Sequence, residues 1–253
     1  MWRPLRTFVL ANKGVSRAIE PRLPQAKFKI DGHYDRTVAR YLNGLSGAAV
    51  AVDFGSGKEC RFARYRLPGA DVKIVGVDIS ETELAENHDV DETRVVDATA
   101  GLPFDAAEVD LVASRYVLEH LPDTETFIAD SGRVLKPGGY SIHLFASKYA
   151  PASILNAVLP PPVSNRLLDL VHPECSGVIG FRAYYDRTYP SELASLLNRH
   201  GFEVVDIAVN YYQSHYYSFF VPVYVLSALY EMIAQAMRLM NLAARAMIVA
   251  RMR

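Results

Sequence analysis

Residues 50–57 are Val-Ala-Val-Asp-Phe-Gly-Ser-Gly, and this stretch decides the fold. A short apolar run ends at Asp53 and continues into a glycine-rich turn, which is typical of a buried strand followed by a loop that approaches a ligand closely. A second apolar run, Ile74–Val77, ends at another acidic residue, Asp78. A carboxylate in that position can accept hydrogen bonds from both hydroxyls of a ribose. The two runs together predict a nucleoside-binding site.

The turn lacks two features of phosphate-binding loops. Gly55-Ser56-Gly57 leads into Lys58-Glu59-Cys60, without the third glycine of the dinucleotide fingerprint. The chain also has no Gly-Lys-Ser/Thr sequence, which excludes a loop of the nucleotide-hydrolase kind. Asp53 would repel a pyrophosphate but suits a cofactor that carries an ammonium group. A dinucleotide is therefore the less favoured alternative.

Further short motifs follow the turn in a fixed order. They are Val77-Asp78-Ile79-Ser80, Val96-Asp97-Ala98-Thr99, Leu102-Pro103-Phe104-Asp105, Val109-Asp110-Leu111-Val112, Val117-Leu118-Glu119-His120-Leu121 and Leu135-Lys136-Pro137-Gly138-Gly139. With these motifs the chain resembles the class I S-adenosylmethionine-dependent methyltransferases, closely over residues 48–145 and more loosely beyond them. The resemblance implies an α/β fold. It would have a Rossmann-like, seven-stranded and mostly parallel sheet with helices on both faces, an antiparallel last strand and a lid insertion.

Strand-like and helix-like segments recur in a pattern that suits this fold. The strand-like runs are Ala48–Asp53, Val72–Val77, Arg94–Val96, Leu111–Ala113, Tyr140–Phe145, Glu203–Val209 and Arg245–Ala250. Helix-like segments are Arg36–Leu45, Glu59–Arg66 and Thr124–Leu135. Their alternation predicts parallel pairing with right-handed crossovers. Lys136-Pro137-Gly138-Gly139 predicts a helix end followed by a turn.

Length and composition fit one methyltransferase domain over residues 1–253, half of whose residues are hydrophobic. Within it, residues 1–45 are expected to form an N-terminal basic arm and helix. Residues 146–190 interrupt the strand–helix rhythm with proline breaks and a run of aromatic residues. Such an insertion is expected over the carboxyl ends of the strands, where ligands bind. We interpret it as a substrate lid, with a packing or dimer element as the alternative.

Charge and apolar patterning limit the choice of partners. The formal net charge is −1, and no basic stripe points to nucleic acid. Residues 1–29 carry seven Lys or Arg against Glu20 alone, which suits a solvated arm over the domain or an arm that meets an anionic substrate or a lipid surface. The apolar run Phe219–Leu226 is too short to span a membrane and is expected to be a buried or interface-forming helix. Two distant cysteines and no evident secretory signal predict a cytoplasmic location.

The resemblance also implies S-adenosylmethionine as the cofactor and assigns residues to it. The expected cofactor-binding residues are Asp53, Gly55, Ser56, Gly57, Asp78, Ile79, Asp97, Ala98, Ser114, Arg115 and Tyr34. The glycine backbone would lie under the methionine and ribose portions, Asp78 would bind the ribose hydroxyls, and Ile79 would stack on the adenine. Asp97 would accept from the adenine amino group. Glu59 stands where the family usually has a third glycine, so the pose of the cofactor carboxylate stays open.

Three histidines are candidates for the catalytic base: His143, His120 and His172. A histidine with a pKa near neutrality can remove a hydroxyl proton as the new bond to carbon forms. His143 interrupts an otherwise apolar run, and a hydrogen-bonded core histidine is the alternative for it. Some ubiquinone-pathway O-methyltransferases carry Glu-x-x-Glu-His at the positions of residues 116–120 and bind a divalent ion there. Here Tyr116 replaces the first carboxylate, so we predict no required metal.

The acceptor is the least determined part of the prediction. The lid and the end of the chain resemble bacterial methyltransferases associated with glycan or lipid-glycan assembly, which implies O-methylation of a hydroxyl on a sugar, a glycolipid or another small molecule. N- or C-methylation of a small metabolite is the alternative on the same fold. A regulatory protein that binds the cofactor without catalysis is a third reading. Whether the protein is a homodimer stays open.

Overall fold

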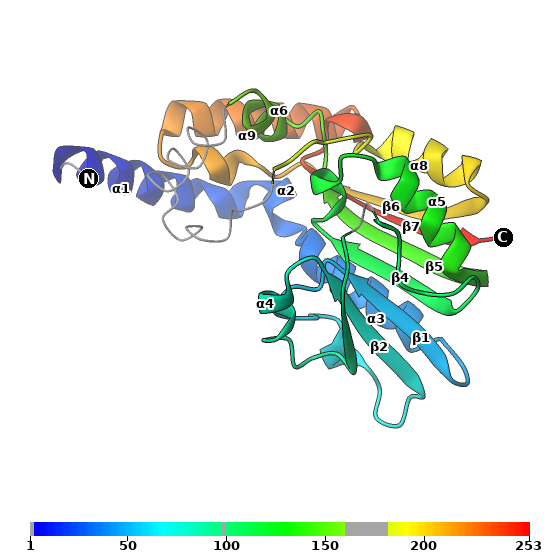
Figure 1. The fold of residues 1–253 in the computed structure, drawn as a ribbon. Coiled ribbons are helices and arrows are strands. Elements are labelled where there is room, and N and C mark those ends of the chain that lie inside the picture. Colours follow the sequence, from blue (N-terminus) through cyan, green and yellow to red (C-terminus); the bar gives the residue numbers. More distant parts are fainter. Residues whose placement is uncertain (1–2, 98–99, 160–181) are drawn as a thin grey trace.

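A computed structural model describes residues 3–97, 100–159 and 182–253, and its centre is a seven-stranded sheet (Figure 1). The strands are β1 (Ala49–Phe54), β2 (Val72–Asp78), β3 (Glu92–Val95), β4 (Val109–Arg115), β5 (Leu135–Ala146), β6 (Phe202–Asn210) and β7 (Arg245–Met252). They lie in the order β3-β2-β1-β4-β5-β7-β6. The pairs from β3 to β5 are parallel, whereas β7 runs antiparallel to both β5 and β6. The predicted mostly parallel sheet with an antiparallel last strand is confirmed.

Helices cover both faces of this sheet. The α-helices are α1 (Arg3–Ile19), α2 (Pro24–Lys27), α3 (Ile30–Leu42), α4 (Glu81–Leu84), α5 (Thr124–Val134), α6 (Pro151–Val158), α8 (Pro190–Arg199) and α9 (Val221–Ala236). Short 3₁₀ helices are η1 (Glu20–Arg22), η2 (Ala63–Tyr65), η4 (Leu118–His120), η6 (Ser214–Tyr217) and η7 (Met240–Leu242). In Figure 1, α3 lies on one face of the sheet and α5 and α8 lie on the other.

The sheet divides the apolar core into two parts, because alternate side chains of a strand point to opposite faces. On the α3 side, Val38 and Leu42 pack with strand residues such as Ala51. On the other side, Phe127 of α5 packs with Val52, the next residue along β1. Burial on both faces explains why β1 is a continuous apolar run rather than an alternating one.

One expected helix is nearly absent. The segment Glu59–Arg66 forms turns and only the short η2, where the sequence predicted a helix. Its backbone and side chains are engaged in tertiary contacts instead. The Cys60 amide donates to Asp89 at 3.0 Å, and the Arg61 guanidinium binds one oxygen of the buried Asp35 at 3.0 and 3.2 Å. These contacts hold the segment in a non-helical conformation.

Two further boundaries differ from the prediction. Lys136-Pro137-Gly138-Gly139 lies within β5, where the pairing with β4 is irregular between Val109 and Leu111, and does not form a separate turn. The third helix begins at Ile30 and ends at Leu42, although helix was expected only over Arg36–Leu45. Its early start places Asp31 and Tyr34 on an ordered helix.

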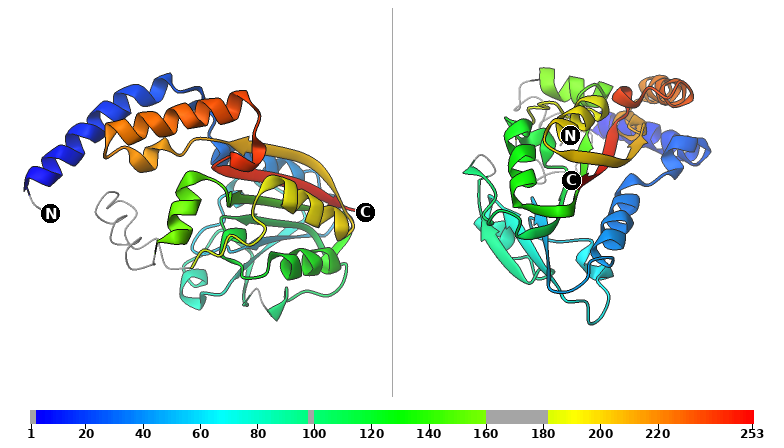
Figure 2. Two further views of the ribbon diagram at one scale, coloured as in Figure 1. Left: turned by 90° about the horizontal axis from the view of Figure 1, so that it is seen from above. Right: turned by 90° about the vertical axis from the view of Figure 1, so that its right-hand side faces the viewer.

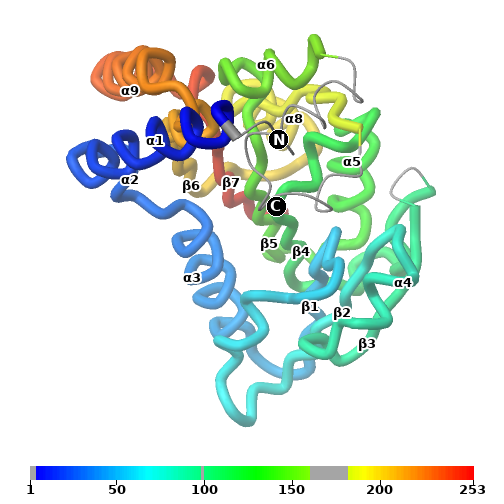
Figure 3. The backbone as a smooth tube through the Cα atoms, turned by 90° about the vertical axis from the view of Figure 1, so that its left-hand side faces the viewer, coloured from blue at the N-terminus to red at the C-terminus, as the bar shows by residue number. Residues whose placement is uncertain are grey.

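The N-terminal basic segment is helical and packs against the C-terminal part of the chain. Figures 2 and 3 show α1 and α9 side by side at one end of the molecule. The Val221 amide donates to Asn12 Oδ1 at 3.0 Å, and Ser16 Oγ donates to the Ser218 carbonyl at 3.1 Å. Among the residues that the structure describes, no helix is long and apolar enough to cross a membrane.

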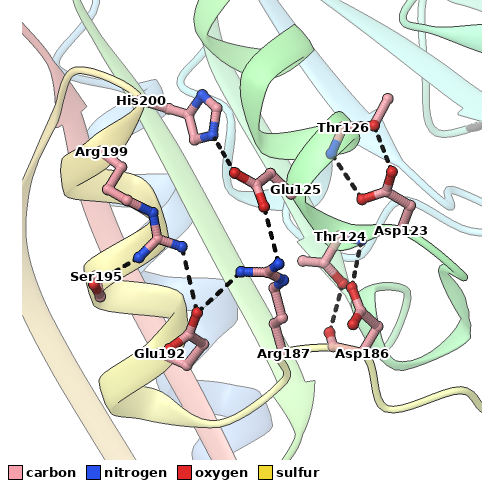
Figure 4. A network of polar contacts seen from close by, with 10 residues as sticks. All are labelled: Asp123, Thr124, Glu125, Thr126, Asp186, Arg187, Glu192, Ser195, Arg199 and His200. Carbon is pink, nitrogen blue, oxygen red and sulfur yellow. Dashed lines mark hydrogen bonds and ion pairs between the residues drawn. The ribbon is translucent and has the colours of Figure 1, made fainter.

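A polar network anchors the chain where it returns to the sheet after residue 181 (Figure 4). The Thr124 amide and hydroxyl donate to the carboxylate and carbonyl of Asp186 at 3.0 and 2.6 Å. Arg187 bridges Glu125 of α5 and Glu192 of α8 at 3.1 and 3.2 Å. The network fixes Asp186 and Arg187 against both helices. Within the proposed lid, residues 160–181 lie outside the described residues.

Candidate functional site

Two cavities lie at the carboxyl ends of the central strands. The first, which we call the glycine cavity, has a volume of about 200 Å³ and is lined by six of the residues predicted to bind the cofactor: Tyr34, Asp53, Gly55, Ser56, Gly57 and Arg115. The second, which we call the tyrosine cavity, has a volume of about 510 Å³ and is lined by Tyr116, Tyr185, Tyr216 and Tyr217 together with Glu119, His120 and Arg245. The structure therefore brings most of the predicted cofactor ligands together around one cavity. That they bind the cofactor stays a prediction.

The turn after β1 needs glycine at its first position. Gly55 has a φ of 73°, in the left-handed region, and its amide donates to the Val77 carbonyl at 2.7 Å. A Cβ at this position would lie 2.1 Å from Cγ2 of Val117. The loop after β4 therefore packs directly on the glycine turn, and no side chain fits between them.

Asp78 at the end of β2 holds the same turn from the other side. One carboxylate oxygen accepts from the Gly57 amide at 2.9 Å, and the other accepts from the Ser80 amide at 2.9 Å. Each oxygen has a further lone pair for a ligand. The side chain is partly exposed, so a ribose could reach it. The contacts show that Asp78 orders the turn, and its binding of a nucleoside stays a prediction.

Asp53 is buried at the floor of the glycine cavity. Burial raises the pKa of this carboxyl to about 6, and hydrogen bonds from Cys60 and Ser56 oppose that rise. Ser56 Oγ donates to Asp53 at 3.1 Å and accepts from Asn87 Nδ2 at 2.8 Å. Asp53 is thus a partly desolvated carboxylate whose charge a cationic ligand group would stabilise.

The lining of the glycine cavity also offers a donor and a cation. The Tyr34 hydroxyl is buried and has no hydrogen-bond partner among the described residues. Burial, together with the nearby Asp53 charge, raises the pKa of Tyr34 well above its usual value, so the phenol keeps its proton. Arg115 lies 3.7 Å from the Glu59 carboxylate. An unsatisfied donor, an arginine and a glycine backbone fit a cofactor with carboxylate, ammonium and ribose groups.

Other predicted cofactor residues lie outside this cavity. Ile79 follows β2 and is 52% exposed, and its stacking on the adenine stays a prediction. Asp97 follows β3 and is exposed, and Ala98 lies outside the described residues. Ser114 is fully buried and its hydroxyl contacts His143 Nδ1 at 2.7 Å. The structure therefore places Ser114 in the core rather than at the methionine end.

His143 is a buried core residue. Ser114 and Ser141 contact its two ring nitrogens at 2.7 and 2.6 Å, and its side chain is 0% exposed. Desolvation lowers the pKa of His143 to about 3, so the ring stays neutral at physiological pH. Because both nitrogens are engaged and neither cavity reaches them, this arrangement argues against a role as catalytic base. It matches the core-histidine alternative.

The other two candidate histidines differ in position. His120 lines the tyrosine cavity, and its Nδ1 contacts the Arg182 carbonyl at 3.1 Å. His172 lies outside the described residues, so its role in the lid stays a prediction. His120 is thus the one predicted base that the described structure brings to a cavity.

A stronger candidate, Glu119, was missed as a base at the sequence level. Its side chain is only 4% exposed, Oε1 accepts from the Ala146 amide at 3.1 Å, and Oε2 has no hydrogen-bond partner among the described residues. Burial raises the pKa of this carboxyl to about 7. In the sequence, Glu119 was recognised only as part of a possible metal-binding motif. Its position shortly after the fourth strand was the signal that could have identified it as a base.

The two cavities adjoin at two elements. Arg115 at the end of β4 lines the glycine cavity, and the next residue, Tyr116, lines the tyrosine cavity. On α3, Asp31 and Tyr34 are about one turn apart and line the tyrosine and glycine cavities respectively. Tyr116 has a φ of 58°, an uncommon conformation that is found at functional sites. The geometry suits a cofactor in one cavity and an acceptor in the other.

Comparisons with known proteins point to a methyltransferase. Residues 52–143 match the methyltransferase domain family. A ubiquinone biosynthesis O-methyltransferase of Acinetobacter baylyi is 28% identical over 193 residues, which cover 71% of this chain and 75% of that protein. A protein of the same name from Mesorhizobium japonicum is 34% identical over 111 residues, and this match covers 42% of each chain. The chain therefore matches less than half the length of that relative.

Solved structures share the fold at low identity. An S-adenosylmethionine-dependent methyltransferase from Mesorhizobium loti has a TM-score of 0.54 at 18% identity and covers 88% of this chain and 100% of its own. Phosphoethanolamine N-methyltransferase 2 of Haemonchus contortus, in complex with S-adenosylmethionine, has a TM-score of 0.52 at 15% identity and covers 87% of this chain and 52% of its own. The match of residues 52–143, the similar relatives and the shared fold support a class I S-adenosylmethionine-dependent methyltransferase.

Proposed function

We propose that this methyltransferase methylates a hydroxyl on a small, largely apolar molecule bound in the tyrosine cavity, and that Glu119 accepts the hydroxyl proton. The observation that carries the proposal is the unsatisfied Oε2 of Glu119 in the wall of that cavity. A buried carboxylate oxygen without a partner costs free energy unless a ligand completes it. A hydroxyl donor of an acceptor would do so.

The cofactor is expected in the glycine cavity, where it supplies a methyl group on a cationic sulfur. We assign the ribose hydroxyls to Asp78 and the ammonium group to the neighbourhood of Asp53. Tyr34 and Arg115 offer a donor and a charge for the carboxylate. Binding in this way holds donor and acceptor together, and such positioning supplies several kcal/mol of the barrier.

Glu119 is suited to proton transfer at neutral pH. In the reaction, the acceptor oxygen forms a bond to the methyl carbon as the carbon–sulfur bond breaks, and the hydroxyl proton passes to Glu119. A base with a pKa of about 7 is half ionised near physiological pH, which favours general-base catalysis. The backbone carbonyl of Glu119 accepts from the amides of Tyr184 and Tyr185 at 2.8 and 3.0 Å, so its position is fixed.

The lining of the tyrosine cavity supports an apolar or aromatic acceptor more than a sugar. Alanine, leucine and tyrosine side chains form most of the wall, and its charged groups are few. The curated relatives are named for O-methylation in ubiquinone biosynthesis, which supports a hydroxylated ring as the class of acceptor. Arg245, 4.0 Å from Asp31, adds a cation that could stabilise a developing oxyanion.

The test combines an acceptor screen with two variants. Phenols, catechols, monosaccharides and primary amines are incubated with the protein and methyl-labelled S-adenosylmethionine, and products are identified by mass spectrometry. With a phenol or catechol acceptor, we expect Glu119→Gln to lower kcat by about 10²- to 10⁴-fold. The affinity for S-adenosylhomocysteine should stay unchanged in calorimetry, because Glu119 does not line the glycine cavity.

The pH profile provides an independent readout. The wild-type rate should rise with pH through about 7 as Glu119 ionises, and this rise should disappear in Glu119→Gln. The matched control is His120→Gln, which changes the neighbouring polar residue of the same cavity and should retain the rise. Methylation of amines alone, or an unchanged kcat in Glu119→Gln, would contradict the proposal.

A further inference from the structure

Helix α9 (Val221–Ala236) is oriented with its polar side inward and its apolar side outward. Leu226, Ile233 and the following Met237 are 68%, 58% and 63% exposed, whereas Glu231 is fully buried. Further exposed residues at helical spacing are Val225, Leu229 and Met232. An ordinary surface helix shows the opposite pattern. This face is therefore an apolar surface that needs an explanation.

Buried polar contacts fix this orientation. The Glu231 carboxylate accepts from Gln25 Nε2 at 2.9 Å, from the Gln213 amide at 3.0 Å and from the Ser214 amide. Ser227, one turn earlier, also contacts Glu231 at 3.3 Å. Rotating α9 to bury its apolar side would leave these amides and the carboxylate without partners, at a cost of several kcal/mol. The outward apolar face is thus built into the fold.

Helix α1 (Arg3–Ile19) extends the same surface. It meets α9 through the polar side chains of Asn12 and Ser16, which bond to the backbone at and before the start of α9. Phe8 contacts Phe220 with ring centroids 6.3 Å apart and is still 48% exposed. The views from above and from the side show the two helices lying along each other (Figures 2 and 3). We call the exposed sides of both helices the α1–α9 face.

Helix α1 also carries positive charge. Arg6, Lys13 and Arg17 occupy one side of α1, at spacings of seven and four residues. Residues 1–29 contain seven basic residues and one acidic residue, Glu20. Within Val221–Ala236 the one charged residue is Glu231, which is buried. The helix that packs against α9 is therefore basic, and α9 presents no exposed carboxylate.

We propose that the α1–α9 face docks on the surface of a bilayer that contains anionic phospholipids. Amphipathic helices lie in the plane of such a surface with their apolar residues below the headgroups, and basic residues bind the anionic headgroups. A second copy of the chain would bring another basic α1 to the same place, whereas an anionic bilayer supplies the opposite charge. Charge complementarity thus favours the bilayer.

The face adjoins the tyrosine cavity. Tyr216, Tyr217 and Phe219 line that cavity and immediately precede α9, and α6 (Pro151–Val158) contributes Leu155 to the wall. Docking would bring the cavity close to the lipid. An acceptor with an apolar chain could then enter from the bilayer. This consequence rests on the proposed function, whereas the docking itself does not.

Flotation with vesicles tests the docking without any methylation assay. The full chain is mixed with vesicles of phosphatidylcholine alone or with about 30 mol% phosphatidylglycerol. We expect the wild-type protein to float with the anionic vesicles and to be released from them by about 0.5 M salt. The fraction that floats with the neutral vesicles should be lower by about fivefold or more. Leu226→Asp/Ile233→Asp should lower partitioning by about tenfold or more, because both charges would enter the apolar layer.

The matched control is Leu67→Asp. Leu67 is 57% exposed, much as Leu226 and Ile233 are, but lies in the loop before β2. This variant should float like the wild type, and circular dichroism should show that all variants are folded. The proposal is overturned if the wild type fails to bind anionic vesicles or if the α9 variant binds normally. It is also overturned if light scattering shows a lipid-free dimer that Leu226→Asp dissociates while vesicle binding is absent.

Discussion

Asp78 orders the glycine turn and is predicted to bind the ribose as well. Its oxygens accept from the Gly57 and Ser80 amides, and its side chain is partly exposed. In Asp78→Asn one acceptor becomes a donor and the charge is lost, which removes charge-assisted contacts worth about 1.5–3 kcal/mol each. We expect the affinity for S-adenosylhomocysteine to fall by roughly 10- to 100-fold in calorimetry.

Asp71→Asn serves as the control for that measurement. Asp71 is an exposed carboxylate just before β2, at the opposite end of the strand from Asp78. Its replacement should leave cofactor affinity unchanged. Equal affinities for wild type and Asp78→Asn would show that Asp78 only orders the turn.

His143 makes the stability of the protein depend on pH. Its folded-state pKa of about 3 lies below the ordinary value of 6.5, so the folded state resists protonation while the unfolded state does not. The stabilisation is therefore fully present above pH 6.5 and is lost as the pH falls from 6.5 toward 3. Ser114 and Ser141 hold the neutral ring in place.

The matching measurement compares urea unfolding of wild type and His143→Gln at pH 7.5 and pH 5. The stability advantage of wild type should be smaller at pH 5 by roughly 2 kcal/mol, because the unfolded histidine gains a proton there. His88→Gln is the control, since His88 is exposed and should give no such difference. A pH-independent advantage for His143 would contradict the assignment as a neutral core residue.

At the scale of elements, the contact between the β1 turn and the loop after β4 decides the shape of the glycine cavity. Gly55→Ala would place a Cβ 2.1 Å from Val117 Cγ2 and strain a φ of 73°. We expect it to cost at least about 2 kcal/mol more in unfolding free energy than Gly69→Ala. Gly69 has a similar φ of 79° but open space around its Cβ position, so Gly69→Ala measures the cost of the backbone conformation without a steric clash.

A double variant checks the source of that cost. Gly55→Ala/Val117→Ala removes the colliding methyl and should recover part of the lost stability, while the backbone strain remains. Urea denaturation of the two single variants and the double variant gives the coupling energy. Equal costs for Gly55→Ala and Gly69→Ala, or no coupling to Val117, would show that the turn can move away.

For the whole molecule, the glycine cavity joins elements that are distant in sequence: α3, the ends of β1 and β4, and, through Asp78, β2. A ligand that contacts all of them stabilises only the folded state. At about 100 times its dissociation constant, S-adenosylhomocysteine should add about 2.7 kcal/mol, which raises Tm by roughly 5–10 °C in a chain of this size. Differential scanning fluorimetry with NAD at the same concentration should show no shift, and an equal shift with NAD would contradict the cofactor assignment.

Local pattern was sufficient for the sheet. All seven strand-like runs correspond to strands, and their ends differ from the strand bounds by at most five residues. The central strands were clearest, because a strand buried on both faces is a continuous apolar run. The glycine turn was equally predictable, since a positive φ and a close approach leave little choice of residue at Gly55. The antiparallel placement of β7 came from family resemblance, because apolar runs carry no information on strand direction.

Contacts between distant residues determined the rest. The helix expected over Glu59–Arg66 was lost to bonds with Asp35 and Asp89, which lie 24 or more positions from the residues they hold. Distant contacts also decide the roles of the functional side chains. In the sequence, His143 and Glu119 are both polar residues near apolar ones, so the local pattern does not distinguish them. Two serines satisfy the histidine, whereas the glutamate lines a cavity and its Oε2 has no hydrogen-bond partner among the described residues. Solvation and hydrogen bonding set the pKa of a side chain, and both depend on which residues the fold brings around it.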